Sequence, residues 1–172
     1  MGMDVYGQNP ARSEGEYFRR NVWSWHPLAD LCNDLAPQIC RQCEDWHSNG
    51  GYGLDGEAAK VLGQLLKAKL VDGSISAYIE ARERSLAALP DEVCSSCQDK
   101  QERQDRAALA GRRTEQVFLD FLNAEKVKQN GACLYCGGSG KRRPIECQYH
   151  VEVEDVQEFA EFLESCGGFE IC

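Results

Sequence analysis

Residues 133–150 read CLYCGGSGKRRPIECQYH and place three cysteines and one histidine close together. Cys133 and Cys136 form a Cys-x2-Cys pair, and Cys147 and His150 form a Cys-x2-His pair after ten intervening residues. Structural zinc sites are closed tetrahedra of thiolate and imidazole ligands, and such pairs often supply them. The spacing therefore predicts zinc binding, with these two pairs as one ligand set.

A second Cys-x2-Cys pair lies upstream, where Cys94 and Cys97 enclose two serines. It competes for the same ion, because two such pairs complete one tetrahedral site. The residues between the two pairs are helical in composition, so a shared ion would anchor both ends of that segment. In addition, Cys147 falls at an inward-facing position in the alternating pattern of a strand, so its presence is explained without a metal. The predicted structural zinc site therefore consists of Cys94, Cys97, Cys133 and Cys136. Cys147 and His150 stay as rival ligands, and two partial sites are a third arrangement.

A further group of potential ligands, with the spacing Cys-x7-Cys-x2-Cys-x3-His, consists of Cys32, Cys40, Cys43 and His47. Its middle spacing is short for a zinc finger, and Cys32 and Cys43 fall on apolar helical stripes. We interpret the cysteines as buried thiols and the histidine as a surface residue, and the sequence leaves a second metal site undecided. Ten cysteines without an export signal favour a reducing, cytoplasmic location.

The chain of 172 residues has a formal net charge of -9, and its acidity lies at the C-terminal end. No lysine or arginine follows Arg143, whereas eight acidic residues do. This distribution argues against direct binding of nucleic acid and against attraction to an anionic membrane surface. Apolar runs are only a few residues long, far short of the roughly 20 residues that a membrane-spanning helix needs.

Apolar periodicity predicts a mainly helical N-terminal half. Apolar residues recur at helical spacing from Leu28 until Pro37 breaks the pattern, and Asp55 is the expected N-cap of the next helix. The expected elements are, in chain order, an irregular segment over 1–20, a helical stretch over 28–46 interrupted at Pro37, helices over 56–70 and 74–88, and a helical insert over 98–129.

The C-terminal end combines a strand signal with a helix signal. Alternating apolar residues predict a strand over 147–153, and Asp155 followed by Glu158 predicts a capping box for the last helix. We expect a short strand at 169–172 to pair with 147–153. The predicted fold is mainly α with a small β component: a helical domain stapled by a four-cysteine zinc site, with a short two-stranded C-terminal ribbon.

The length of the chain suits a single domain over 1–172. Within it we distinguish a helical part over 21–90 and a zinc-clasp part over 91–150 that contains the helical insert. An acidic helix and strand over 151–172 complete the predicted organisation.

Several stretches carry a family resemblance: MGMDVYG at 1–7, EYFRRNVWSWHPLADLC at 16–32, NGGYGLDGEAA at 49–59, the paired Cys-x2-Cys units, and VQEFAEFLESCGGFEIC at 156–172. Together they are similar to a family of small uncharacterised bacterial and phage-encoded proteins. The resemblance implies the four-cysteine site, a host cytoplasm if the chain is phage-encoded, and no particular activity. The unit CLYCGGSG also resembles the repeat of the zinc-binding domain of DnaJ-type chaperones, which supports zinc binding but not a chaperone function.

The sequence contains no recognisable catalytic motif, and its three histidines fall in no catalytic spacing. We therefore expect no enzyme but a small zinc-stabilised binding or regulatory protein that contacts a protein partner. Its candidate binding surface on the acidic helix consists of Glu154, Glu158, Glu161 and Phe162. An acidic inhibitor that blocks the nucleic-acid groove of a host enzyme is one alternative, and a zinc-dependent enzyme of unknown reaction is a second.

Overall fold

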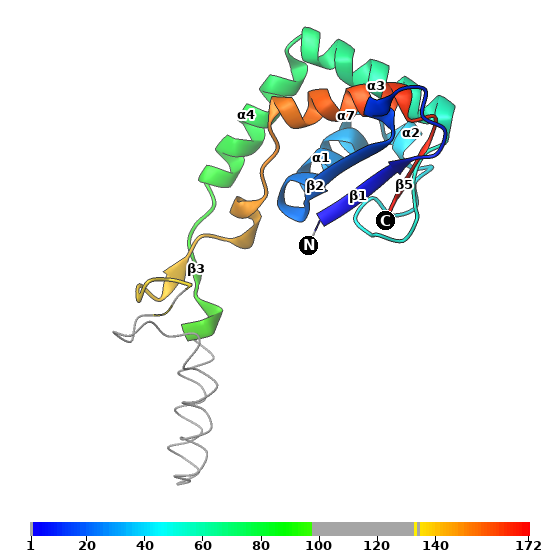
Figure 1. Ribbon diagram of the computed structural model, residues 1–172. Coiled ribbons are helices and arrows are strands. Elements are labelled where there is room, and N and C mark those ends of the chain that lie inside the picture. Colours follow the sequence, from blue (N-terminus) through cyan, green and yellow to red (C-terminus); the bar gives the residue numbers. More distant parts are fainter. Residues whose placement is uncertain (1, 98–132, 134) are drawn as a thin grey trace, which may run out of the picture. The chain divides into compact units, whose positions relative to one another are not determined.

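The structure is a computed structural model, and it describes residues 2–97, 133 and 135–172. The chain divides into two compact units (Figure 1). The first, the sheet unit, comprises residues 1–87 and 146–172. The second, the cysteine unit, comprises residues 88–145. The N- and C-terminal segments thus belong to one unit, and the cysteine unit is inserted between them in the sequence.

A three-stranded antiparallel sheet joins the two ends of the chain. Its strands lie in the order β2-β1-β5, with the bounds β2 (Tyr17–Asn21), β1 (Gly2–Gly7) and β5 (Phe169–Ile171). Val5 on the central strand lies opposite Phe18 on one side and Ile171 on the other. Because directly opposite side chains share a face of a sheet, this register places all three together on the buried face.

The sheet corrects two predictions. We predicted an irregular segment over 1–20 and a C-terminal ribbon between 147–153 and 169–172, and both predictions are wrong. Residues 145–148 form the 3-10 helix η2 (Ile145–Gln148), and the His150 N–H donates a hydrogen bond to the Trp23 carbonyl at 3.0 Å. The expected partner strand is therefore bonded to the start of a helix, and β5 pairs with β1 instead. The fold is mixed α/β with small antiparallel sheets rather than mainly α with one ribbon.

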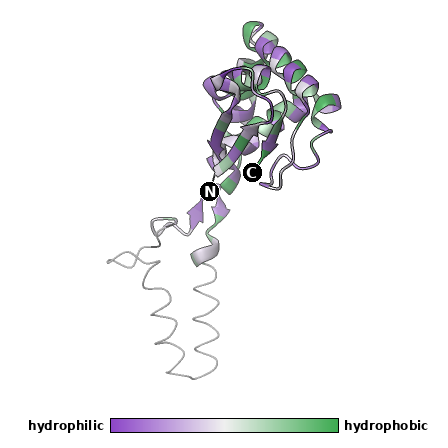
Figure 2. Cartoon of the chain, turned by 45° about the vertical axis from the view of Figure 1, so that its right-hand side comes forward, coloured by the Kyte–Doolittle hydropathy of each residue, from purple (hydrophilic) through white to green (hydrophobic). Residues whose placement is uncertain are grey.

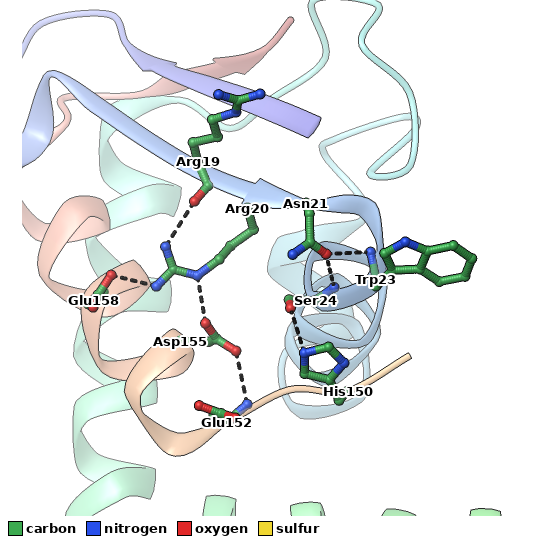
Figure 3. A network of polar contacts seen from close by, with 9 residues as sticks. All are labelled: Arg19, Arg20, Asn21, Trp23, Ser24, His150, Glu152, Asp155 and Glu158. Atoms are coloured by element: carbon green, nitrogen blue, oxygen red, sulfur yellow. Dashed lines mark hydrogen bonds and ion pairs between the residues drawn. The ribbon is translucent and has the colours of Figure 1, made fainter. Parts of the chain in front are cut away.

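Helix α1 (Val22–Leu35) follows β2 directly. The side chain of Asn21 caps it by accepting hydrogen bonds from the N–H groups of Trp23 and Ser24 (Figure 3). Pro37 begins the short helix α2 (Pro37–Cys40), because proline fits the first turn of a helix, whereas Pro27 lies inside α1. The predicted break at Pro37 is confirmed.

Two further helices agree with the sequence prediction. Helix α3 (Gly56–Val71) begins after Asp55, whose carboxylate accepts a hydrogen bond from the Ala58 N–H at 2.8 Å. Helix α4 (Ser74–Ala87) follows a turn at Gly73, where φ is +79°. A positive φ favours glycine, and this residue ends the first helix and permits the second. The predicted N-cap and both helices are confirmed.

The last helix, α7 (Val153–Ser165), begins earlier than predicted. Glu152 is its N-cap, and the Asp155 carboxylate completes the capping box by accepting a hydrogen bond from the Glu152 N–H at 3.0 Å (Figure 3). The capping box predicted from Asp155 and Glu158 is therefore wrong. These two carboxylates instead bind Arg20 of β2, whose guanidinium lies 2.6 Å from Asp155 and 2.5 Å from Glu158.

Aromatic rings form the centre of the sheet unit's core. The ring of Phe18 lies 5.0 Å from that of Phe159 and 6.4 Å from that of Trp25, measured between centroids. Phe162 and Phe169 are fully enclosed in the same cluster, and only 1% of Phe162 is exposed. The predicted position of Phe162 on a binding surface is therefore wrong. Figure 2 shows apolar and polar residues interspersed along the helices, as expected for elements with one buried side.

Backbone hydrogen bonds hold the N-terminal loop against the end of α7. The Gln8 N–H donates to the Gly168 carbonyl at 2.8 Å, and the Asn9 N–H donates to the Cys166 carbonyl at 3.0 Å. Between these carbonyls, Gly167 has a φ of +64°, and a Cβ there would collide with the Asn9 carbonyl oxygen. The position of α7 is thus fixed by main-chain contacts as well as by the core.

The cysteine unit contains a two-stranded antiparallel sheet of β3 (Glu92–Val93) and β4 (Lys141–Arg142). The predicted helical insert over 98–129 lies outside the described residues. Among the helices that the structure describes, none has both the length and the apolar character that crossing a membrane requires.

Candidate metal centre

The short sheet of β3 and β4 positions the first cysteine pair. Val93 lies opposite Lys141, and the pairing continues where the Cys94 N–H donates to the Gly140 carbonyl at 2.8 Å. Cys94 therefore lies beside the glycine-rich turn that follows the second cysteine pair. The Cys97 N–H donates to the Cys94 carbonyl at 3.0 Å, which forms a tight turn between the two thiols of the first pair.

A glycine-rich turn positions the second cysteine pair. The Gly137 N–H donates to the Cys133 carbonyl at 2.7 Å, and the Ser139 N–H donates to the Cys136 carbonyl at 3.1 Å. Gly137 has a φ of +62°, which residues with a Cβ rarely adopt. The glycines that follow the second cysteine therefore allow the chain to reverse and enter β4.

The four thiols of these two pairs converge. The Sγ atoms of Cys94 and Cys133 lie 3.9 Å apart, and those of Cys97 and Cys136 lie 3.4 Å apart. All four Sγ atoms lie within 4.8 Å of one another. The structure thus brings together the four cysteines that the sequence singled out and places them to bind a metal ion.

The spacing of the sulfur atoms fits a tetrahedral ion. Metal–sulfur bonds of about 2.3 Å, as zinc forms, place the sulfurs of a tetrahedron about 3.8 Å apart. The separations of 3.4 and 3.9 Å lie on either side of that value. The Gly140 N–H also donates to the Cys136 Sγ at 3.4 Å. Such hydrogen bonds from outside the ligand set orient and stabilise thiolate ligands.

Hydrogen bonds within the cluster favour thiolate at some positions. Burial raises the pKa of Cys136, but hydrogen bonds from the Cys97 thiol and the Gly140 N–H outweigh this effect and lower the pKa to about 6. The Tyr135 N–H lowers the pKa of Cys133. Conversely, the bond that Cys97 shares with Cys136 raises the pKa of Cys97 to about 12. A metal ion would displace the protons that remain on the thiols.

The rival ligands Cys147 and His150 have partners within the sheet unit. The Cys147 thiol donates to the Leu86 carbonyl at 3.6 Å, and the His150 Nε2 lies 3.3 Å from the Ser24 hydroxyl (Figure 3). In the part of the chain that the structure describes, only the four cysteines form a group of three or more ligating side chains close enough to share an ion. The structure therefore brings neither rival ligand into the cluster.

The second Cys/His group of the sequence lies in and around the core of the sheet unit. Cys32 and Cys40 are fully buried, and the Cys40 thiol donates to the Cys32 carbonyl at 3.3 Å. Burial raises the pKa of Cys40 to about 12 and that of Cys43 to about 11. His47 is exposed, and its Nε2 lies 3.3 Å from the Asp30 carboxylate. This arrangement agrees with buried thiols and a surface histidine.

A cleft of about 570 Å³ lies between the C-terminal half of α1, the loop over 40–47 and α4. In its wall, the Tyr78 hydroxyl donates a hydrogen bond to the Asp34 carboxylate at 2.7 Å. Burial and this carboxylate together raise the pKa of Tyr78. Cys40 and Cys43 also line the cleft, but thiols with raised pKa values are weak nucleophiles.

The acidic surface of α7 differs from its sequence prediction. Glu154 and Glu161 are exposed, whereas Glu158 is bonded to Arg20 and Phe162 is buried. Sequence reasoning missed Arg20 as a partner of this helix, because 138 positions separate it from Glu158 and no local pattern links them.

The fold and the cluster define the chain as a mixed α/β protein with four cysteines placed to bind a metal ion. Comparisons of the chain with models of known families, with curated proteins and with solved structures found no match. The resemblance to small bacterial and phage-encoded proteins therefore stays an expectation from the sequence.

Proposed function

We propose that the four cysteines of the cluster bind one zinc ion that stabilises the cysteine unit. The observation that carries this proposal is the convergence of the four Sγ atoms within 4.8 Å of one another. Thiolates are soft ligands that select zinc, copper(I) or iron over hard cations such as magnesium. Four cysteines in a tetrahedron are a common ligand set of structural zinc sites.

A structural role for the ion follows from this ligand set. Catalytic zinc sites keep one position for water or substrate, whereas four thiolates fill all the positions of a tetrahedron. The strands β3 and β4 have only two residues each, and so short a pair is not stable by itself in water. An ion that joins residues 94–97 to residues 133–136 would supply the cross-link that this pair needs. A zinc-dependent reaction is therefore the less favoured alternative.

Elemental analysis of the purified chain tests the ligand set. We expect one zinc ion per chain in the wild type, loss of the ion in Cys94→Ser and retention in Cys147→Ser. Cys172→Ser, which removes an exposed thiol outside the cluster, is the matched control and should retain the ion. Retention by Cys94→Ser together with loss by Cys147→Ser would show instead that the rival ligands bind the metal.

A second proposal concerns a protein partner. The sheet unit contains 20 acidic and nine basic residues, a net charge of -11, whereas the cysteine unit has a net charge of +2. The carboxylates of Glu154 and Glu161 are exposed on α7. A strongly acidic unit attracts basic partners and accelerates their association. We infer that the sheet unit binds a basic protein surface, such as the nucleic-acid groove of a host enzyme, in the cytoplasm.

Affinity capture from a host lysate tests this second proposal. The wild type should capture a nucleic-acid-processing protein at low salt and release it at about 0.5 M salt, where the screening length is about 4 Å. The double variant Glu154→Lys/Glu161→Lys should capture much less. Glu44→Lys/Glu80→Lys, which changes the net charge equally on other elements, should capture nearly as much as the wild type. Equal capture by both double variants would contradict a role for the α7 surface.

A further inference from the structure

Two sulfur contacts in the cluster run between the two Cys-x2-Cys pairs. Cys97 contacts Cys136 at 3.4 Å and Cys94 contacts Cys133 at 3.9 Å. Each contact therefore joins the segment before residues 98–132 to the segment after them. A disulfide requires its sulfurs to approach to about 2.05 Å. The Cys97–Cys136 contact is the shorter of the two, so it requires the smaller movement.

We propose that oxidation by a peroxide converts this cluster into two disulfides, Cys94–Cys133 and Cys97–Cys136, and that these bonds keep the two segments joined after the metal has left. This inference deepens the proposed zinc site and rests on it for the release of the ion. The oxidised site is then a second, covalent form of the same cross-link.

The chemistry requires one peroxide molecule for each disulfide. A thiolate attacks one peroxide oxygen, the O–O bond breaks, and the cysteine becomes a sulfenic acid while the other oxygen leaves as water after taking up a proton. The neighbouring thiol then attacks the sulfenic sulfur, and the S–O bond breaks to release a second water. Two sulfurs lose two electrons in total, and the peroxide gains them. The disulfide sulfurs carry no charge and no longer neutralise a bound cation, so the ion is released.

The burial of the cysteines determines the order in which the two disulfides form. Cys94 is fully buried, whereas Cys97, Cys133 and Cys136 are each partly exposed. Peroxide therefore reaches both members of the Cys97–Cys136 contact but only one member of the Cys94–Cys133 contact. We expect Cys97–Cys136 to form first, and Cys94–Cys133 to follow.

Which cysteines become linked by disulfides depends on whether the chain is folded. In an unfolded chain, closing a short loop costs less entropy than closing a long one, so disulfides within each Cys-x2-Cys pair are favoured. The two cysteines of each proposed disulfide, Cys94–Cys133 and Cys97–Cys136, are separated by 39 positions. Only the contacts of the folded unit therefore favour these two disulfides. Oxidation in denaturant is thus the internal control for oxidation of the native protein.

Disulfide mapping of the full-length chain tests the proposal. Trypsin should release peptides 85–100 and 129–141, which are linked to each other only when the disulfides cross between the pairs. Chymotrypsin then cleaves after Tyr135 and separates Cys133 from Cys136, and fragmentation of the upstream peptide separates Cys94 from Cys97. We expect the Cys97–Cys136 link at one equivalent of hydrogen peroxide and both links at two. A colorimetric chelator should show release of the zinc in parallel.

Three results separate the failure of this inference from the failure of the zinc site. Links within each Cys-x2-Cys pair in the native protein would overturn the inference even if zinc is bound and released. Cross-links in a chain that never contained zinc would support the pairing and contradict the zinc proposal. In Cys136→Ser, the Cys94–Cys133 link should still form, and a Cys94–Cys97 link in its place would overturn the proposed contacts.

Discussion

The sulfur atoms of Cys97 and Cys136 lie 3.4 Å apart, although 39 positions separate the two residues in the sequence. Closing so long a loop costs entropy, but this cost grows only with the logarithm of loop length. The described strands of the cysteine unit contribute two residues each and offset little of that cost. The order of this unit should therefore depend on the bound ion.

Removal of the metal should loosen the cysteine unit and leave the sheet unit folded. All three tryptophans, Trp23, Trp25 and Trp46, belong to the sheet unit, so their fluorescence reports on that unit alone. Chelation should leave this fluorescence unchanged. At the same time, exchange of the Cys94 amide hydrogen should accelerate about tenfold or more, which corresponds to at least about 1.4 kcal/mol of opening free energy. A parallel loss of tryptophan fluorescence would show that the metal stabilises both units together.

Replacement of Arg20 by alanine should destabilise the sheet unit by about 2 kcal/mol, as expected for loss of hydrogen bonds to charged groups. The Arg20 side chain is only 20% exposed and bonds Asp155 and Glu158. Arg19→Ala is a matched control, because its side chain is 60% exposed and pairs with Asp4 at 3.3 Å. That change should cost less than about 1 kcal/mol. Urea unfolding followed by tryptophan fluorescence measures both, and equal effects would contradict the assigned role of Arg20.

Replacement of Phe162 by alanine distinguishes a core residue from a surface residue. Because Phe162 is buried among Phe18, Phe159 and Phe169, we expect a loss of about 3–5 kcal/mol in the free energy of unfolding. A surface position would change it by no more than about 0.5 kcal/mol. Glu161→Ala, on the exposed side of the same helix, is the control and should remain near the wild type.

The stability of the sheet unit should decrease in mild acid, in part because of His26. Burial, assisted by the neighbouring His47 and opposed by Asp30, lowers the pKa of His26 below its ordinary value of 6.5. The unfolded chain therefore binds a proton at a pH where the folded chain does not. The contribution of His26 to stability is complete above pH 6.5 and is lost as the pH falls through the folded-state pKa.

The variant His26→Gln tests this pH dependence. The difference between its urea midpoints at about pH 7 and about pH 5 should be smaller than in the wild type, because the variant lacks the titrating group. His150→Gln, at an exposed histidine, is the control. An unchanged difference in His26→Gln would show that other groups cause the loss of stability in acid.

Local signals in the sequence were sufficient for helices α3 and α4, for the break at Pro37 and for the cysteine pairs. Asp55 bonds an amide three residues later, and Pro37 acts within its own turn, so both are readable from adjacent residues. The ligand spacing of Cys94 with Cys97 is likewise a local pattern.

Contacts between distant segments were not readable in the same way. The strand β1 alternates buried and partly exposed residues over only a few positions, and its partner β5 lies at the other end of the chain. The alternation over 147–153 suggested a strand, yet its backbone is bonded to the carbonyl of Trp23. The capping box of α7 was misplaced because Asp155 closes a box that begins at Glu152, whereas Glu158 bonds Arg20 on a distant strand.

X-ray absorption at the zinc edge counts and identifies the ligands of the ion in the intact protein, and therefore tests the four-cysteine site. We predict four sulfur neighbours at about 2.3 Å and no nitrogen neighbour. A shell that includes nitrogen at about 2.0–2.1 Å would place a histidine at the metal and contradict the site formed by Cys94, Cys97, Cys133 and Cys136.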